Sequence, residues 1–285
     1  MTDSNEKLIS WLFKTNAVRV CPEDKPFWYT SGTIGPYYIN THFLYGSEDS
    51  ANGLLKMIDT EKNKMLECPS RLLEVIKVNY AENEIFRGLI DEMLLFIKEN
   101  INIDEVDYIS GGERRDWFFS LIVANLLQKP HITIYKDLSM VLTKDGSTKE
   151  IKEIGTAKVL HIADLITEAS SYQRAWIPAI RSLGAELKWS VVVVDRKQGG
   201  EEYLSGEGIK ALSMIKIEKS LFNKALEMNL INRQQNDMLM GYIDNPKESM
   251  KDFLKRHPEF MKNSLEADVK TRERAQLCIE KNIYG

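Results

Sequence analysis

Short apolar runs recur about every 25 residues through the middle of the chain. Five of them have the length of strands and are mostly rich in β-branched residues: Val106–Ser110, His131–Tyr135, Val159–Ala163, Trp189–Asp195 and Ala211–Ile217. Amphipathic stretches of helical length lie between them, notably Trp117–Leu127 and Ser170–Leu183. This alternation predicts βαβ units, and continuous apolar strands predict a sheet covered on both faces. The expected fold is α/β, a mostly parallel sheet flanked by helices.

The two ends of the chain follow a different pattern. Residues 1–100 indicate a helix, an aromatic segment rich in Gly and Pro (Phe27–Tyr45) and further helices, of which Ala81–Glu99 is the longest. After Ile217 every periodic segment is helical: Ser220–Asn229, Arg233–Ile243, Pro246–Arg256 and Ser264–Lys281. X-Pro pairs interrupt this tail, since a proline disfavours helix at the residue before it. We therefore expect an N-terminal hood (1–60), a core (61–217) and a helical extension packed on the core (218–285).

Composition narrows the class of protein. Of the 285 residues, 43% are hydrophobic and 28% charged, as is usual for a globular protein. The net charge of −4 gives no general reason to bind nucleic acid or an anionic membrane. No apolar run approaches the roughly 18 residues that span a bilayer, and the polar N-terminus lacks a secretory pattern. We expect a cytoplasmic protein with three reduced cysteines, structural histidines and no metal ligands of its own.

Candidate chemistry follows the predicted strands, because open α/β sheets bind ligands beyond the carboxyl ends of their strands. The first such end carries Gly-Gly-Glu-Arg-Arg-Asp at 111–116. Two glycines permit close approach of the backbone to a ligand, and Arg114 and Arg115 offer forked donors for an anion. The same residues also suit a plain strand-to-helix turn with solvated charges, although paired glycines beside paired arginines favour a site.

Two further strand ends repeat this composition. After Val159–Ala163 come Asp164 and a run of small hydroxyl residues, which either cap the next helix or hold a phosphate while Asp164 binds ribose hydroxyls. The fourth predicted strand ends in Asp-Arg-Lys-Gln-Gly-Gly at 195–200. Three strand ends of this kind are harder to explain as turns than any one alone.

These segments resemble the type I phosphoribosyltransferases, and among them the orotate phosphoribosyltransferases. Val159–Ser171 (VLHIADLITEASS) is similar to the signature of that fold, with only one of its two acidic residues kept. Tyr29–Asn40 (YTSGTIGPYYIN) is similar to the N-terminal element of the orotate enzymes, and Val194–Leu204 (VDRKQGGEEYL) to one of their strand ends. Ile134–Asp137 (IYKD) occupies the place of their segment before a mobile loop. The resemblance covers roughly 27–45 and 106–217, in the same order and spacing.

The resemblance implies transfer of a phosphoribosyl group from phosphoribosyl pyrophosphate (PRPP) to orotate or a related acidic or heterocyclic base, in pyrimidine nucleotide metabolism. It implies a homodimer, Mg²⁺ held mainly by substrate, and the following residue roles. PRPP would bind Arg114, Arg115, Lys136, Asp164, Thr167, Ala169, Ser170 and Ser171; Asp164 and a mobile Lys144 would be catalytic; Tyr38, Ile39 and Arg196 would bind the base. Cations on the departing pyrophosphate and a closed lid suit this chemistry, which passes through a sugar cation.

Several positions depart from the family pattern. Ala163 replaces the first acidic residue, Ala169 replaces a glycine, and Thr30 stands where a lysine is usual. Glu168 enters the phosphate loop; two like charges about 4 Å apart repel by about 1 kcal/mol in water, so it must point outward if phosphate binds. The lid segment also lacks the usual Lys-Asp-His. Two hypotheses stay open: an active Mg²⁺-dependent enzyme, or a catalytically weak relative that binds PRPP or nucleotide in a regulatory role.

Overall fold

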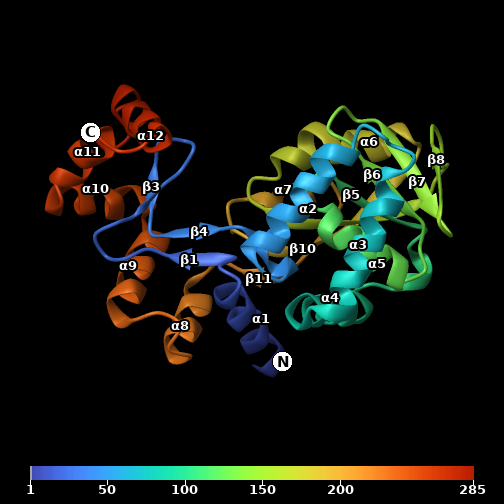
Figure 1. Cartoon of the computed structure of the whole chain (residues 1–285), viewed down its shortest axis with the longest axis horizontal. Helices are drawn as coiled ribbons and strands as arrows, with labels where there is room; N and C mark the ends of the chain where they lie inside the picture. The colour runs from blue at the N-terminus through green and yellow to red at the C-terminus, as the bar shows by residue number, and fades with distance from the viewer. Residues whose placement is uncertain (1) are drawn as a thin grey trace. The chain divides into compact units, whose positions relative to one another are not determined.

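A computed structural model describes residues 2–285, which divide into two compact units, each built from two stretches of the chain (Figure 1). The first, here called the core unit, holds the N-terminal residues as far as Trp11 together with Thr41–Ile217. The second, the hood–tail unit, holds Leu12–Asn40 and Glu218–Gly285. The division between them falls within helix α1 (Thr2–Lys14).

The core unit is built on a seven-stranded sheet with strand order β11-β10-β9-β5-β6-β7-β8. In chain order the strands are β5 (Tyr108–Gly112), β6 (His131–Ile134), β7 (Met140–Lys144), β8 (Ser147–Glu150), β9 (Lys158–Ile166), β10 (Glu186–Asp195) and β11 (Lys210–Lys216). The strands from β11 to β6 pair in parallel, whereas β6, β7 and β8 pair antiparallel. The predicted mostly parallel sheet is confirmed, and the β7–β8 hairpin at its edge was not expected.

Helices cover both faces of this sheet. On one side lie α2 (Glu48–Glu61), α3 (Cys68–Glu82), α4 (Glu84–Asn100) and α5 (Trp117–Leu126); on the other lie the π-helical turn η3 (Tyr172–Trp176), α6 (Ile177–Ser182) and α7 (Gly200–Gly206) (Figure 1). Short 3₁₀ turns occupy η1 (Thr41–Tyr45) and η2 (Ile103–Glu105). The helix expected over Ala81–Glu99 starts later, because Asn83 caps α4 by accepting the Phe86 N–H at 2.9 Å.

The hood–tail unit combines two short ribbons with five helices. Strand β1 (Val18–Val20) pairs with β4 (Tyr37–Ile39), and β2 (Phe27–Trp28) pairs with β3 (Ile34–Gly35), both antiparallel. The helices are α8 (Lys219–Glu227), α9 (Arg233–Asp244), α10 (Pro246–Arg256), α11 (Glu259–Leu265) and α12 (Val269–Glu280). The single helix expected over Ser264–Lys281 is wrong: Asp268 starts a new helix by accepting the N–H groups of Lys270 and Thr271.

The hood and the tail share one apolar core. Its buried members come from both stretches of the unit: Trp28, Ile34, Met250, Phe253, Ala275 and Cys278. The chain therefore divides differently from the expected order of hood, core and extension, since residues 12–40 pack with the tail helices. A pairing of such distant segments has no local sequence signal.

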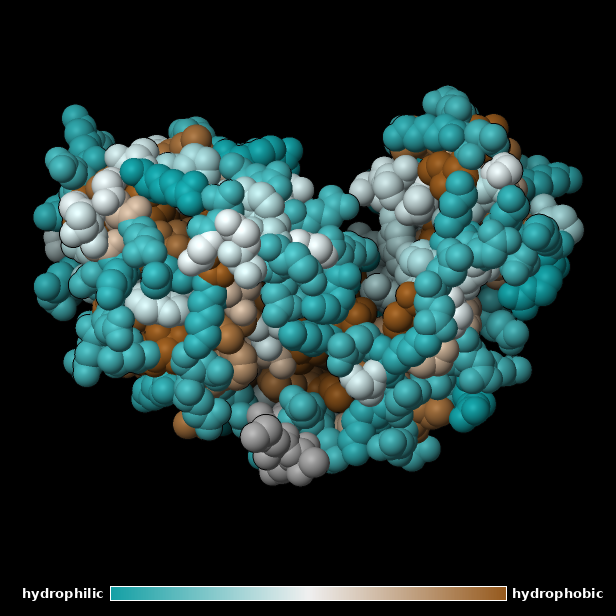
Figure 2. Space-filling view, turned by 180° about the vertical axis from the view of Figure 1, so that it is seen from behind, coloured by the Kyte–Doolittle hydropathy of each residue, from teal (hydrophilic) through white to brown (hydrophobic). Residues whose placement is uncertain are grey.

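The surface is mostly hydrophilic in the space-filling view, in keeping with the charged content (Figure 2). All three cysteines, Cys21, Cys68 and Cys278, are buried free thiols. Among the helices that residues 2–285 form, none is both long and apolar enough to cross a membrane.

Candidate PRPP site

A cavity of about 290 Å³ lies in the core unit at the carboxyl ends of β5 and β9. The residues that line it come from the two predicted loops and the helical turn behind them: Glu113, Arg114, Arg115, Asp116, Ala163, Asp164, Leu165, Ile166, Thr167, Ala169, Ser170, Ser171, Tyr172 and Trp176. Seven of the eight residues predicted to bind PRPP are among them; Lys136 is not. Two strand ends separated by about 50 residues in the sequence thus meet at one cavity.

The paired glycines of the first loop have an internal packing role. A Cβ atom on Gly111 would lie 2.1 Å from Ser120 Oγ, and one on Gly112 would lie 2.2 Å from the Trp176 ring. The space over both glycines is therefore filled by the protein itself. Close approach of a ligand is not the reason for these glycines, which corrects the sequence interpretation.

Two buried aspartates face each other in the cavity. Asp164 is 9% exposed and Asp116 is 6% exposed. Asp116 Oδ1 accepts the Asp164 N–H at 3.0 Å, and its Oδ2 accepts the Gly112 N–H at 3.1 Å. Burial raises the pKa of Asp164 to about 8; the Asp116 carboxylate adds to this rise and Arg115 opposes it. A ligand that supplies hydroxyl donors or a cation would therefore stabilise this pair of acids.

Two histidines pack behind the loops. His161 is fully buried, its Nδ1 lies 2.9 Å from Ser110 Oγ, and its ring stacks on Trp176 at 5.9 Å. His131 lies 2.9 Å from the hydroxyls of both Ser120 and Thr133, and burial lowers its pKa to about 3. Within residues 2–285 there is no cluster of three or more His, Cys, Asp or Glu that could hold a metal ion.

The phosphate loop carries one strained residue and one outward carboxylate. Ala169 is buried and has φ of +59°, in the left-handed region that favours glycine. Glu168 is exposed and does not line the cavity. A Cβ on Gly200 would lie 2.5 Å from the Thr167 carbonyl oxygen, so the strand end after β10 packs closely on this loop. Because Glu168 is exposed and lies outside the cavity lining, its carboxylate does not oppose the binding of a phosphate there.

Ala169→Gly is expected to stabilise the protein by about 0.5–1 kcal/mol. The left-handed conformation costs a non-glycine residue about 1–2 kcal/mol, and the greater entropy of glycine in the unfolded chain returns part of this. Denaturant unfolding measures the change. Ala179→Gly in α6, also buried, is the matched control and should destabilise by about 1 kcal/mol or more. A similar loss of stability in both variants would show that the left-handed backbone at Ala169 is not strained.

A second cavity, of about 780 Å³, adjoins the first and shares Glu113, Arg114, Ser171 and Trp176 with it. Its further lining includes three cations, Lys62, Lys136 and Arg174. Glu113 joins its walls: Oε1 accepts from Lys62 Nζ at 3.0 Å and Oε2 accepts the Lys136 N–H at 2.9 Å. Arg114 forms an ion pair with Asp59. Sequence reasoning missed Glu113, whose only local signal is its place between paired glycines and paired arginines.

The remaining predicted residues lie elsewhere. Lys144 ends β7 beside the two-residue turn Asp145–Gly146, is exposed and lines neither cavity. Arg196 follows β10 and donates its N–H to the Ile166 carbonyl at 3.0 Å. Tyr38 and Ile39 belong to β4 of the hood–tail unit. Their roles in catalysis or base binding stay predictions.

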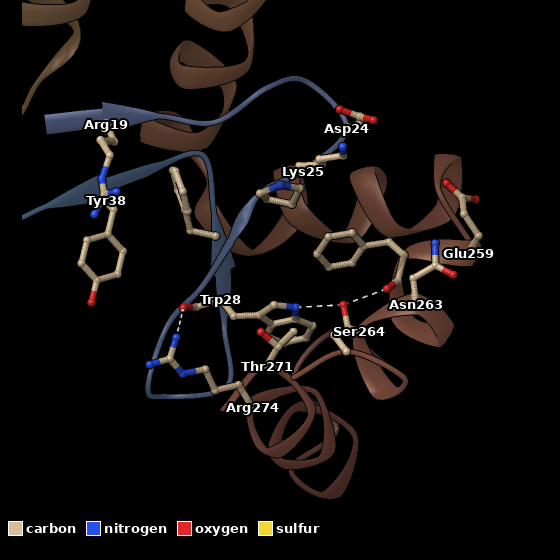
Figure 3. Close-up of a pocket in the computed structure, with 14 residues that line it drawn as sticks. Arg19, Asp24, Lys25, Trp28, Tyr38, Glu259, Asn263, Ser264, Thr271 and Arg274 are labelled. Atoms are coloured by element: carbon tan, nitrogen blue, oxygen red, sulfur yellow. Dashed lines mark hydrogen bonds between the residues drawn. The ribbon is translucent and has the colours of Figure 1, made fainter. Parts of the chain in front are cut away.

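Tyr38 lines a cavity of about 690 Å³ inside the hood–tail unit (Figure 3). Figure 3 shows Tyr38 beside Arg19 on one side of the cavity and Ser264 on the other. Trp28 joins the walls, since its Nε1 donates to Ser264 Oγ at 3.0 Å and its carbonyl accepts from Arg274 at 2.8 Å. The sequence did not indicate this cavity, because its tail residues follow the pattern of solvated helices.

Comparison with known proteins adds sequence relatives and a fold. No protein-family model matches the chain. The orotate phosphoribosyltransferase of Sulfolobus acidocaldarius is 26% identical over 163 residues, 56% of this chain and 77% of the relative. That of Staphylothermus marinus is 24% identical over 222 residues, 77% of this chain and 87% of the relative. Among solved structures, UMP synthase of Leishmania donovani matches 84% of this chain but only 42% of its own, with a TM-score of 0.56 and 18% identity.

The sheet has the fold of the type I phosphoribosyltransferases, and the sequence relatives support a protein similar to that family. Within that family the sequence relatives are orotate phosphoribosyltransferases, which are glycosyltransferase enzymes.

Proposed function

We propose that this protein transfers the phosphoribosyl group of PRPP to orotate or a related base and releases pyrophosphate. One observation carries the proposal. The buried carboxyl of Asp164 lies in the same cavity as the hydroxyl-rich loop Thr167–Ser171 and the exposed guanidinium of Arg115. A ribose 5-phosphate presents the complementary groups, namely hydroxyls for a carboxylate and an anion for hydroxyls and cations.

Each part of the proposed site has a distinct task. Ser170, Ser171 and Thr167 would hold the 5′-phosphate, and Asp164 would accept the ribose hydroxyls. The second cavity, whose lining holds four cations and the acids Asp59 and Glu113, would receive the pyrophosphate beside Lys136 and Arg114. The pyrophosphate would leave with the electron pair of the anomeric C–O bond while a base nitrogen forms the new bond. Arg196, Tyr38 and Ile39 would bind the base, and a homodimer is the proposed assembly.

Magnesium would be held chiefly by the substrate. Asp116 and Asp164 offer two carboxylates, which is fewer than a complete protein cage, and Mg²⁺ usually pairs one or two carboxylates with phosphate oxygens and water. When bound, the ion would neutralise charge on the departing diphosphate.

Turnover is the direct test. The protein is incubated with PRPP, Mg²⁺ and orotate, and pyrophosphate release and loss of orotate absorbance are followed together. We expect equal amounts of both. If no base gives release while PRPP still raises the melting temperature, the regulatory binding function applies; Ala163 and the strained Ala169 favour that alternative. If PRPP gives no thermal shift, both functions fail.

Glu168→Ala is expected to change the affinity for PRPP by less than about threefold. The carboxylate is exposed and does not line the cavity, so solvent screens its repulsion of a bound phosphate. Titration calorimetry with PRPP and Mg²⁺ measures the change. A tenfold or larger gain would show that Glu168 turns inward and obstructs the phosphate.

A further inference from the structure

The strand that carries Asp164 offers a single carboxylate, because Ala163 precedes it. Ala163 is 2% exposed and lines the same cavity as Asp164. A second carboxylate nevertheless reaches this cavity from another part of the chain. It belongs to Asp116, the last residue before α5, 48 residues earlier in the sequence.

Asp116 is anchored by contacts that a plain helix-capping residue would not make. It makes no side-chain cap to its own helix; its two oxygens instead accept the N–H of Gly112 at the end of β5 and the N–H of Asp164 on β9. The carboxylate thus joins the two loops that wall the cavity. His161 Nε2 lies 3.5 Å from Asp116 Oδ2, beyond a normal hydrogen bond.

This placement brings two carboxylates together with little solvent. Each oxygen of a carboxylate can accept about two hydrogen bonds, so the backbone contacts leave acceptor capacity on Asp116. Arg115 is the cation whose charge acts on Asp164 from the cavity rim. Two buried carboxyl groups with one cation in the same cavity favour a ligand that brings hydroxyl donors or a hydrated divalent ion.

We propose that Asp116 is the second acid of this site: it holds the Asp164 and Gly112 amides in place and, with Asp164, binds the hydroxyls and the hydrated Mg²⁺ of a phosphoribosyl ligand. The inference rests on the proposed function and deepens it. In this chain the pair of acids is divided between strand β9 and the turn before α5, and the acid missing at Ala163 is supplied by Asp116.

The test moves the acid from the turn before α5 to strand β9. Asp116→Asn is expected to weaken PRPP binding about 10-fold or more and to raise the Mg²⁺ concentration needed for half-maximal binding, since hydrogen bonds to charged groups are the strong ones. Adding Ala163→Asp to Asp116→Asn restores a carboxylate at the cavity wall and should recover most of both losses. Glu168→Gln, which removes an exposed acid from the neighbouring loop, is the matched control and should leave both values unchanged.

A second readout does not depend on PRPP. In the ligand-free protein, Asp116→Asn removes one cause of the high pKa of Asp164, so the pH at which Asp164 titrates by NMR should fall. A loss of binding that Ala163→Asp does not recover, together with an unchanged Asp164 titration, would make Asp116 merely structural and overturn the proposal. Unchanged PRPP binding in Asp116→Asn overturns it as well. If the wild-type protein binds no PRPP, the proposed function fails and the ligand role falls with it, while the titration still reports whether the two acids interact.

Discussion

Asp164→Asn is expected to lower kcat/KM for PRPP about 10- to 100-fold and, at the same time, to stabilise the ligand-free protein at alkaline pH. In the proposed complex with PRPP and Mg²⁺ Asp164 would be ionised, and a hydrogen bond to a charged group contributes about 1.5–3 kcal/mol, which sets the size of the catalytic loss. The gain in stability has a separate cause, because Asp164 is buried beside Asp116. Residues that bind a ligand often lower the stability of the ligand-free protein.

The pH window follows from the raised pKa of Asp164. Between about pH 4 and pH 8 the folded protein keeps a proton on this carboxyl that the unfolded chain releases. The native state therefore loses stability as the pH rises through this range, by at most about 1.4 kcal/mol per pH unit, and the loss levels off above pH 8. Asparagine has no such proton. The variant should match the wild type in stability near pH 4 and be more stable than the wild type at about pH 8.5.

Denaturant unfolding at a series of pH values, paired with initial rates of pyrophosphate release, measures both effects. Glu168→Gln is the control, since it removes an exposed acid nearby and should show neither effect. A variant that is less stable at every pH would mean that Asp164 is ionised and well solvated in the folded protein. Unchanged kcat/KM would remove Asp164 from the site.

Trp28→Ala is expected to destabilise the hood–tail unit by about 3–5 kcal/mol, the usual cost of emptying a buried aromatic site. The indole is 7% exposed, stacks on Phe260 at 5.8 Å and donates to Ser264 Oγ. Both partners belong to the tail, so the indole connects β2 to α11 across more than 230 residues of sequence. Losing it should release the tail helices.

Circular dichroism during denaturant unfolding measures this change, with proteolysis reporting where the chain opens first. We expect cleavage in 218–285 to accelerate while the sheet of the core unit persists. Ser264→Ala, which removes the acceptor of the indole hydrogen bond and the donor to the Phe260 carbonyl but keeps the indole, should cost about 1 kcal/mol. Equal costs for the two variants, or cleavage that starts in the core unit, would contradict the shared core of hood and tail.

Periodicity predicted β5, β6, β9 and β10 closely because nearly all of their residues are buried. Trp189–Asp195, for example, lies within β10, and the continuous apolar run carries its own signal. Shorter elements gave no such signal. The two-residue strands β2 and β3 pair by backbone hydrogen bonds in an aromatic segment without alternation, and β8 (Ser-Thr-Lys-Glu) is a polar edge strand.

Some residues of the candidate site could likewise be predicted from the sequence and others could not. Asp164, Ser170 and Ser171 could be predicted because they follow a strong strand signal in one continuous motif. Asp116 and Glu113 could not, because their importance arises from contacts to Asp164, Lys62 and Lys136, which lie far away in the sequence. The glycines of 111–112 show the reverse error: their motif indicated a ligand, and the structure fills their space with Ser120 and Trp176.

Local sequence patterns were enough to predict the α/β class, the positions of the central strands along the chain and the polar composition at their ends, since hydrophobic period and strand-end composition are local properties of the chain. Long-range packing sets which distant groups share a cavity, leaves Glu168 exposed and joins residues of the hood to the tail helices. Each of those outcomes depends on contacts between segments separated by tens to hundreds of residues, where burial and hydrogen bonding, not local propensity, set the free energy.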